Sequence, residues 1–572
     1  MGVHLQEAAL FLRFRSLSML NHVPHHFLFL FLIFLVISSA VVQFFPDAFI
    51  AVERFGTRLA ERKRLCIILL ATTAVVFRVI LLLAVPIPHP EIHDEFSYLL
   101  AGDTFAHGRF TNPPHPMAAY FDTFHVIQNP TYMSIYPPAQ GVALGLGQLL
   151  GHPWIGVLLS VSVMTGTILW ALQAWFPARW ALLGGILVLL QTAISGYWIN
   201  SYWGGAVAAT GGALVFGALP RIIRSGRPRD AIILGLGASI LANSRPFEGL
   251  IFCLPAFAVL VVWIFGRHRP PLQRMILYIV LPFCAVIALC VCFMGYYNFR
   301  VTGHPSLFAY VLNVRSHFAI PQLAWEKSTT PFHFKNPQFE AYYNHWWPAM
   351  AWPKGRPNSI SHLASAFGLD SWRFTLFYLY PVFLIAILAA PWILRDRRMR
   401  FPIAQLLCCF AGFLLVAWFQ AHYAAALTAT TFAVVVQGFR HIRHCHILKR
   451  PQGVYLSQAL VVTALLLSPF HNHDPLPPMA YRQEIEAELA SQPGTALVVV
   501  HYSAHHDPSQ EWVFNHADID HEKVVWARDI PGMSLQPLFA HFRGRRIWFV
   551  DPDENRPKIY PHEPSTQALD AR

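Results

Sequence analysis

Charged residues are scarce in this chain of 572 residues: they make up 13% of it, whereas hydrophobic residues make up 55%. The apolar residues gather in runs of about twenty, the length that crosses roughly 30 Å of hydrocarbon, and short basic clusters separate the runs. A soluble core does not explain this arrangement. Acidic residues are fewer than basic ones, 30 against 42, but most basic residues lie in linkers between apolar runs. The positive charge therefore indicates membrane topology and not a nucleic-acid partner.

Cysteine is also scarce, with eight residues, and no two of them have the CxxC spacing of a metal site. All eight lie in apolar runs or in basic linkers that we assign to the cytoplasm, so we expect no disulfide framework. No repeat of fixed period is visible, and Pro-rich stretches such as PIPHP and NHDPLPPM mark the ends of apolar runs. The sequence predicts a helical, polytopic integral membrane protein, in the plasma (inner) membrane if the source is bacterial.

The apolar runs predict about twelve membrane spans. The first run, roughly residues 27 to 45, is too long and too poorly matched to a cleavage site for a signal peptide, so we interpret it as a span or anchor. About eleven core spans are expected at about 66–85, 154–176, 179–198, 203–219, 230–244, 247–266, 274–296, 374–394, 402–419, 421–438 and 454–470.

Basic clusters set the expected orientation of these spans. The linker 54–64 is richer in Arg and Lys than the segment holding Arg13 and Arg15, so the first core span should run from inside to outside. Alternation along the chain then assigns the remaining basic linkers to the inside, which is consistent with the positive-inside rule. These linkers are 221–229, 267–274, 395–400 and 440–450.

Three large polar pieces share the outer face in this topology: loops 87–153 and 298–373, and the tail. We therefore divide the chain into three parts: an N-terminal extension with one hydrophobic segment (1–63), a transmembrane domain (64–470) and an extracytoplasmic C-terminal domain (471–572). The last part alternates expected helices and strands, which predicts a small α/β domain. The expected helices are 482–490 and 535–542, and the expected strands are 495–502, 523–528 and 546–550.

The first outer loop carries the acids that best suit catalysis. Its sequence PIPHPEIHDEFSYLLAGDTFAHGRF predicts a short helix that starts near Asp94 and stops at Gly108. A carboxylate partly shielded by membrane and loops should be a stronger base than in water, able to take the proton of an acceptor hydroxyl. Asp94 and Glu95 are therefore the catalytic candidates. In the alternative interpretation, Asp94 caps the helix and Glu95 offsets the helix dipole.

An acidic pair just after the first core span resembles the GT-C fold, specifically glycosyltransferase family 39. That family includes proteins like the dolichyl/polyprenyl-phosphate-mannose protein mannosyltransferases and the lipid A aminoarabinose transferases. The first Asp of this loop is catalytic there, and Asp94 is the matching position. YPPAQGVALGLGQLLG, from Tyr136, resembles the two prolines that open an interfacial helix in the family, with Tyr136 in place of the usual Lys. The role of that lysine is not carried over.

Two later motifs extend the resemblance over roughly residues 64 to 470. SRPFEG around Arg245 matches a basic residue at the outer end of a span, and AHYAAAL around His422 and Tyr423 matches a short His-Tyr motif between late spans. The resemblance implies inverting transfer of a hexosyl or pentosyl group from a polyprenyl-phosphate donor to a lipid, glycan or protein acceptor.

The donor phosphate has three candidate ligands: Arg245, His422 and Tyr423. A planar guanidinium holds phosphate by two hydrogen bonds and stabilises the charge of a departing phosphate. The alternatives are that Arg245 snorkels to the interface with Glu248 as its partner, and that Tyr423 is an interfacial anchor. For His422, the two alternatives are contact with phosphate or sugar and a purely structural role.

Further polar and aromatic residues of the outer face are expected to contact substrate, although aromatic residues in YWINSYWGG equally suit a membrane belt. The aromatic residues of loop 298–373 predict either a lid over the acceptor or an amphipathic layer on the membrane. The substrate-binding candidates are His93, Tyr98, Tyr136, Asn200, Tyr202 and Arg300.

No cofactor is expected. Several residues of the first outer loop are suitable metal ligands, but no spacing puts two of them on one helical face, so no metal is predicted. These residues are His89, Glu91, His93, Asp94 and His107.

Two other functions remain open. A lipid or solute transporter or flippase also has many spans, but polar residues usually lie near the midplane of such proteins and their halves are related. Here the polar groups concentrate in outer loops, which favours an enzyme at the membrane surface. A non-catalytic membrane scaffold would keep its function after loss of Asp94.

Overall fold

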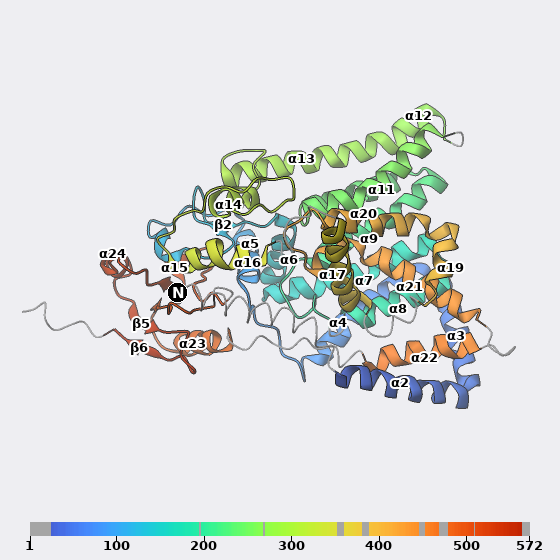
Figure 1. The fold of residues 1–572 in the computed structure, drawn as a ribbon, viewed down its shortest axis with the longest axis horizontal. Helices are drawn as coiled ribbons and strands as arrows, with labels where there is room; N and C mark the ends of the chain where they lie inside the picture. Colours follow the sequence, from blue (N-terminus) through green and yellow to red (C-terminus); the bar gives the residue numbers. More distant parts are fainter. Residues whose placement is uncertain are drawn as a thin grey trace, which may run out of the picture.

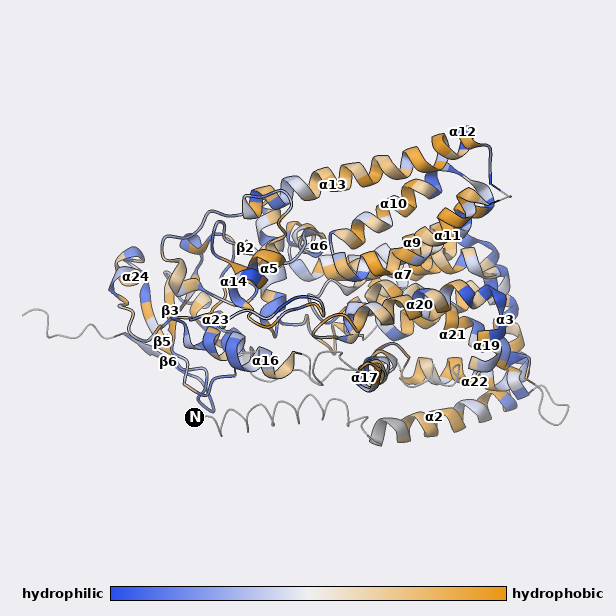
Figure 2. Cartoon of the chain, turned by 45° about the horizontal axis from the view of Figure 1, so that its top comes forward, coloured by the Kyte–Doolittle hydropathy of each residue, from blue (hydrophilic) through white to orange (hydrophobic). Residues whose placement is uncertain are grey.

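The computed structural model describes residues 25–193, 196–266, 269–351, 360–379, 388–445, 452–467, 479–507 and 510–562. Long helices lie side by side at one end of the molecule and a small sheet lies at the other, with short helices between them (Figure 1). Apolar residues dominate the long helices (Figure 2). Residues 1–24 and 471–478, which belong to the expected N-terminal and C-terminal parts, lie outside the described residues.

The helical bundle is built from the apolar runs of the sequence. Its first helices are α2 His25–Phe44, α3 Pro46–Glu61, α4 Lys63–Leu81, α7 Pro153–Trp175, α8 Ala178–Val188 with the π-helix η2 Leu189–Ala193, α9 Gly205–Ser225, α10 Pro228–Ala242 and α11 Pro246–Phe265. They are followed by α12 Leu272–Met275, η3 Ile276–Val280, α13 Leu281–Thr302, α17 Ile360–Leu379, α19 Ala390–Arg395, η5 Arg397–Met399, α20 Arg400–Phe413, η6 Ala421–Leu427, α21 Thr428–Arg443 and α22 Gln452–Leu467.

Five helices of the described residues are long and apolar enough to cross a membrane: α4, α7, α9, α11 and the continuous helix Leu272–Thr302. The count rises to six if α2 and α3, which meet at 92°, form one broken span. The chain is thus a helical membrane protein, as predicted. Other expected spans coincide with shorter helices of 11 to 16 residues: α8, α10, α20, α21 and α22.

These shorter helices explain why the long helices of the described part do not reach the expected count of about twelve. A helix of 15 residues extends only about 22 Å, and the chain between α20 and α21 leaves the α-helical path to form the 3₁₀ helix η6. Irregular backbone at membrane depth is tolerated where protein buries it. The expected span 374–394 begins earlier, as α17 at Ile360, and residues 380–387 of it lie outside the described residues.

The first outer loop forms a helix, a hairpin whose two strands have two residues each, and a second helix. Helix α5 ends with Gly108 in the left-handed conformation, φ 69°, which glycine adopts without steric cost; the predicted end is confirmed. The two prolines open α6 as predicted. The elements are α5 His93–Ala106, η1 Ala118–Phe121, β1 Val126–Ile127, β2 Met133–Ser134 and α6 Pro138–Leu149; the second loop contributes α14 Ala309–His317, α15 Pro337–Phe339, η4 Glu340–Trp346 and α16 Trp347–Met350.

The C-terminal part is a small α/β unit, as predicted. Its sheet has the order β4-β3-β5-β6; the first three strands are parallel and β6, which the sequence did not predict, is antiparallel. Strand β3 lies between β4 and β5 and is buried along its whole length. The elements are α23 Met479–Ser491, β3 Ala496–Val500, η8 Ile519–His521, β4 Val524–Arg528, α24 Gln536–His541, β5 Arg546–Val550 and β6 Ile559–Pro561.

This α/β unit packs directly on α5. The ring of Phe96 lies 4.6 Å from that of Phe514, and Asp103 accepts a hydrogen bond of 2.8 Å from the backbone N–H of Ala517. Tyr132 of the first loop donates to the carbonyl oxygen of Asn515 at 2.8 Å. Helix α5, which carries Asp94 in its first turn, is therefore held between the membrane helices and the C-terminal unit.

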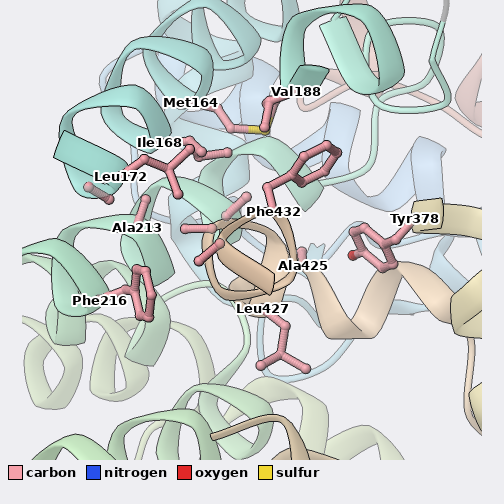
Figure 3. Packing of buried hydrophobic residues seen from close by; sticks show 14 of the residues in the cluster. Met164, Ile168, Leu172, Val188, Ala213, Phe216, Tyr378, Ala425, Leu427 and Phe432 are labelled. Atoms are coloured by element: carbon pink, nitrogen blue, oxygen red, sulfur yellow. The ribbon is translucent and has the colours of Figure 1, made fainter. Parts of the chain in front are cut away.

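The centre of the bundle lies around η6 and α21. Figure 3 shows Phe432 of α21 near Met164 of α7 and Val188 of α8, whereas Leu427 of η6 points to the opposite side. A Cβ atom on Gly212 of α9 would overlap the carbonyl oxygen of Ala426, so glycine is what allows η6 to approach α9. The position of His422 and Tyr423 at the start of η6 depends on this close contact.

We expect Gly212→Ala to destabilise the protein by about 1–3 kcal/mol, because the added methyl group meets rigid backbone. Thermal unfolding in detergent measures the effect. The matched control is Gly56→Ala on α3, where a Cβ atom meets nothing within 4 Å and the change should be neutral or slightly stabilising. Equal unfolding temperatures for the two variants would contradict the close packing of η6.

Candidate functional site

Asp94 lies in the first turn of α5, but it does not cap the helix. The N-cap residue is Ile92, with no side-chain cap hydrogen bond, so the capping interpretation is wrong. Oδ1 of Asp94 accepts a hydrogen bond from the hydroxyl of Tyr136 and lies 3.1 Å from Nδ1 of His125. Oδ2 lies 3.7 Å from Nε2 of His93. The carboxylate thus faces two imidazoles and a phenol.

These neighbours decide the protonation of Asp94. Burial alone would raise its pKa, but the charge and hydrogen bond of His125, the charge of His93 and the hydrogen bond of Tyr136 hold the pKa well below its usual range. The expectation that shielding makes this carboxylate a stronger base than in water is therefore wrong. Asp94 is ionised throughout the physiological range of pH.

His125, which the sequence reasoning missed, reaches Asp94 from the segment between η1 and β1. Its backbone is left-handed, with φ 59°, which is uncommon for a residue other than glycine. The carbonyl oxygen of His125 accepts hydrogen bonds from the hydroxyl of Ser97 at 2.6 Å and the N–H of Ile135 at 3.2 Å. No motif or spacing marks His125, since its partners come from distant parts of the loop.

Glu95 points its carboxylate at backbone. Oε2 accepts from the N–H of Glu91 and Oε1 from the N–H of Tyr202, both at 2.8 Å. Burial raises the pKa of Glu95 to about 7, against the effect of these hydrogen bonds. The side chain therefore joins the start of the loop to the turn before α9. Its role as a second catalytic acid stays a prediction.

Arg245 lies at the N-cap of α11, so its predicted position at the end of a span is confirmed. Its guanidinium carbon is 4.4 Å from the centre of the Tyr423 ring. The ring of Tyr98 stacks on that of Tyr136, with centres 4.3 Å apart. Burial raises the pKa of Tyr98 to about 12; Arg245 opposes this shift and Asp94 adds to it. These five residues therefore form one electrostatically coupled group.

His422 lies next to this group. It is 8% exposed, and its ring centre is 4.6 Å from that of Trp203 and 4.7 Å from that of Tyr423. Its Nε2 atom has no hydrogen-bond partner among the residues that the structure describes. A buried nitrogen of this kind is unfavourable unless a ligand completes it. The structure thus brings His422 and Tyr423 together with Arg245.

Three of the substrate-binding candidates have other contacts. Asn200 accepts a hydrogen bond from Nη2 of Arg78 at 3.1 Å, and Tyr202 donates to the carbonyl oxygen of Pro88 at 2.9 Å. Arg300 is exposed on α13, where Nη1 donates to the hydroxyl of Tyr296 at 2.9 Å. Their contacts with substrate stay predictions.

The second outer loop packs over the two histidines. The ring of Tyr342 lies 5.6 Å from that of His93 and 6.3 Å from that of His125. Tyr343 is buried, and Phe124 packs 4.6 Å from Tyr342. Of the two predicted arrangements for this loop, these contacts favour a lid over the site.

Two sets of side chains have ligand atoms within 4.8 Å of one another: His93, Asp94 and His125, and His115, Asp520 and His541. Two imidazoles and a carboxylate in the first set suit zinc or a similar cation. In the second set, Nδ1 of His115 accepts from the N–H of Met117 at 2.9 Å. The proton therefore sits on Nε2, which points at Asp520, so this set fits a hydrogen-bonded triad better than a metal.

The residues of the first outer loop that the sequence marked as suitable metal ligands do not come together as one set. His93 and Asp94 meet His125, which lies outside the original group, whereas His107 pairs with Asp103 at the opposite end of α5, with Nδ1 3.5 Å from Oδ1. Their spacing along the chain thus gave no guide to their arrangement.

No protein-family model and no curated protein sequence matches the chain. Among solved structures, it is similar to ArnT from Cupriavidus metallidurans bound to undecaprenyl phosphate: identity is 12%, coverage is 84% of this chain and 92% of that one, and the TM-score is 0.44. It is also similar to the Archaeoglobus fulgidus oligosaccharyltransferase tethered with an acceptor peptide, with 12% identity, coverage of 76% and 62%, and a TM-score of 0.42. The chain thus spans less than two thirds of the archaeal enzyme. These similarities assign no activity, substrate or residue to this chain.

The raised pKa of Glu95 predicts a pH-dependent stability. Its folded-state pKa of about 7 lies above the ordinary value of 4.5, so the folded protein binds the proton more tightly and should lose stability as pH rises between those values. From pH 5 to 7.5 we expect Glu95 to contribute a loss of roughly 2–3 kcal/mol. Glu95→Gln should remove this contribution, as measured by thermal unfolding at both pH values.

Glu484→Gln on the exposed face of α23 is the control for the loss of one carboxyl group. It should follow the pH dependence of the unchanged protein. If the stability of Glu95→Gln changes with pH in the same way as that of the unchanged protein, the raised pKa of Glu95 is disproved.

Proposed function

We propose that this protein is a membrane glycosyltransferase that moves a hexosyl or pentosyl group from a polyprenyl-phosphate donor to the hydroxyl of a lipid, glycan or protein acceptor. Asp94 is the general base, and the reaction takes place on the outer face of the membrane. The supporting observation is the ionised, partly buried carboxylate of Asp94 in one coupled group with the guanidinium of Arg245. The sequence resemblance to GT-C enzymes of family 39 supports the same activity.

A polyprenyl-phosphate donor suits the chemistry of this region. Arg245 precedes an apolar helix whose Leu250, Leu254 and Phe257 are at least 45% exposed within the protein itself. Hydrocarbon covers such side chains in a membrane, so a lipid chain along α11 would bring its phosphate to the guanidinium. Nε2 of His422 supplies a further hydrogen bond to the phosphate.

The proposed transfer is a single displacement. The acceptor oxygen forms a bond to the anomeric carbon while the bond from that carbon to the phosphate oxygen breaks. The electron pair leaves with the phosphate, whose charge Arg245 stabilises, and the acceptor proton moves to Asp94. Attack opposite the leaving group inverts the anomeric centre.

A weakly basic Asp94 is compatible with this step. The acceptor oxygen becomes strongly acidic only as it bonds to the anomeric carbon, so the proton passes late and an ionised carboxylate in place suffices. Tyr136 and His125 hold that carboxylate in one orientation. A metal at His93, Asp94 and His125 is no part of this scheme; activity that survives chelation of divalent cations is expected.

Asp94→Asn should lower kcat for sugar transfer by about 10²–10⁴-fold with little change in KM for the donor, because the base is lost while the phosphate ligands remain. The assay follows transfer from polyprenyl-phosphate sugars in membranes or detergent. Asp103→Asn is the matched control: it removes a buried carboxylate from the same helix, where Asp103 accepts from Gln148 and Ala517.

The control should change stability and leave kcat near that of the unchanged protein at a temperature where both are folded. His125→Ala should cost less than Asp94→Asn. A larger loss in His125→Ala would instead make the imidazole the base, and full activity of Asp94→Asn would refute catalysis at this carboxylate.

Arg245→Gln should weaken binding of a polyprenyl phosphate by about 10–100-fold, since the loss of a charge-assisted bidentate contact is worth about 1.5–3 kcal/mol. Arg245→Lys should restore part of it. Binding can be measured by the ligand-induced rise in unfolding temperature. Arg274→Gln, which removes the arginine stacked on Tyr278, is the control. Equal affinities in the Arg245→Gln and Arg274→Gln variants would exclude Arg245 from the phosphate site.

A further inference from the structure

Arg528, the last residue of β4, is completely buried at the boundary between the C-terminal unit and both outer loops. Its Nη2 atom forms an ion pair with Oε2 of Glu511. Nη2 and Nε also donate to the carbonyl oxygen of Asp122 at 3.2 and 3.4 Å, and Nη1 donates to Oε1 of Gln338 at 3.2 Å. One guanidinium thus ties a strand to two loops that lie far away in the sequence.

Glu511 is itself held in place. Its Oε1 atom accepts hydrogen bonds from the hydroxyl of Tyr502 at 2.5 Å and from the N–H of Val513 at 2.8 Å. The Tyr502 ring lies under the guanidinium of Arg528, 4.8 Å from its carbon atom. Tyr502 and Val513 both belong to the C-terminal unit, so Glu511 and Arg528 are held in place within that unit and Arg528 approaches the loops as a preorganised donor.

The two loop contacts of Arg528 lead directly to the candidate site. Asp122 is followed within three residues by Phe124 and His125. Gln338 precedes Phe339, whose ring packs 5.0 Å from that of Phe124. Phe124 lies 5.4 Å from His93. Arg528 therefore holds both sides of the aromatic packing that surrounds the two histidines.

The segment at His125 needs external support. A left-handed backbone is unfavourable for histidine and persists only where its surroundings impose it. On the C-terminal side of His125, its carbonyl oxygen accepts hydrogen bonds from Ser97 and Ile135. On the N-terminal side of His125, the backbone is held by contacts that include the two hydrogen bonds from Arg528 to the carbonyl oxygen of Asp122.

We propose that Arg528 is a positioning residue for the Asp94–His125 pair, through which the C-terminal domain completes the transferase site. This role rests on the proposed function of Asp94. Arg528 contacts no substrate; it fixes the segment whose imidazole orients the carboxylate. A detached or altered C-terminal domain would leave Asp94 in its helix and misplace its partner.

The test uses a double variant, because removing only Arg528 leaves the charge of Glu511 buried and is expected to unfold the region. Arg528→Met/Glu511→Gln in the full-length protein removes both charges and keeps the side-chain volume. Arg546→Met, which removes an arginine bonded to Gln492 within the same domain, is the matched control. Arg528→Lys tests rescue by a single-point cation.

The first readout is kinetic. The double variant should unfold within a few degrees of the control, show a 10–100-fold lower kcat for sugar transfer, and keep its KM for the polyprenyl-phosphate donor. Arg528→Lys should lie between the double variant and the unchanged protein. A double variant with the kcat of the control would overturn the proposal, as would equal changes in kcat and KM.

The second readout does not depend on activity. Diethyl pyrocarbonate labels accessible imidazoles, and mass spectrometry locates the label. His125, with its side chain 11% exposed, should react at least fivefold faster in the double variant than in the Arg546→Met control, while the exposed His501 serves as the internal reference. Unchanged labelling of His125 would refute positioning by Arg528. The two proposals can fail separately. If His125 is labelled faster in the double variant but Asp94→Asn keeps full activity, positioning by Arg528 is upheld and the proposed function is disproved.

Discussion

An ionised carboxylate away from bulk water is stable only where neighbouring groups compensate its charge. Asp94 meets this requirement with partners from three segments: His93 from its own helix, His125 from the bend before β1, and Tyr136, two residues before α6. Each partner restricts the path of the first outer loop. The conformation of that loop, including the left-handed backbone at His125, follows from the need to bring these side chains to one carboxylate.

The membrane helices supply the other half of the site for a different physical reason. Apolar side chains set the positions of α9, α11 and η6, and the polar residues at their ends are carried with them. Glycine at position 212 lets η6 approach α9, which brings His422 and Tyr423 beside Arg245. An arginine at the end of an apolar helix combines a cation with a hydrocarbon-facing surface, and a lipid phosphate has the complementary anion and hydrocarbon chain.

The C-terminal unit is part of the same structure and not an appended module. It shares a hydrophobic cluster with α5 and the first loop, in which Phe96, Tyr120 and Tyr132 are buried against the residues of the sheet. Buried ion pairs contribute little net stability but hold geometry where every partner is satisfied. The pair of Arg528 and Glu511 has this character, since backbone and side-chain groups from three regions complete it.

The sequence by itself determined the features that depend on local patterns. Long apolar runs predicted the membrane helices, short apolar runs predicted β3, β4 and β5, and Gly108 predicted the end of α5, because the length of a run and the backbone freedom of glycine are properties of consecutive residues. The motifs around Asp94, Arg245 and His422 also marked residues that the fold brings together. His125, Arg528 and the ionised state of Asp94 were decided only by the tertiary structure. They arise from contacts across distant segments, and burial and charge at such contacts have no signature in the order of residues along the chain.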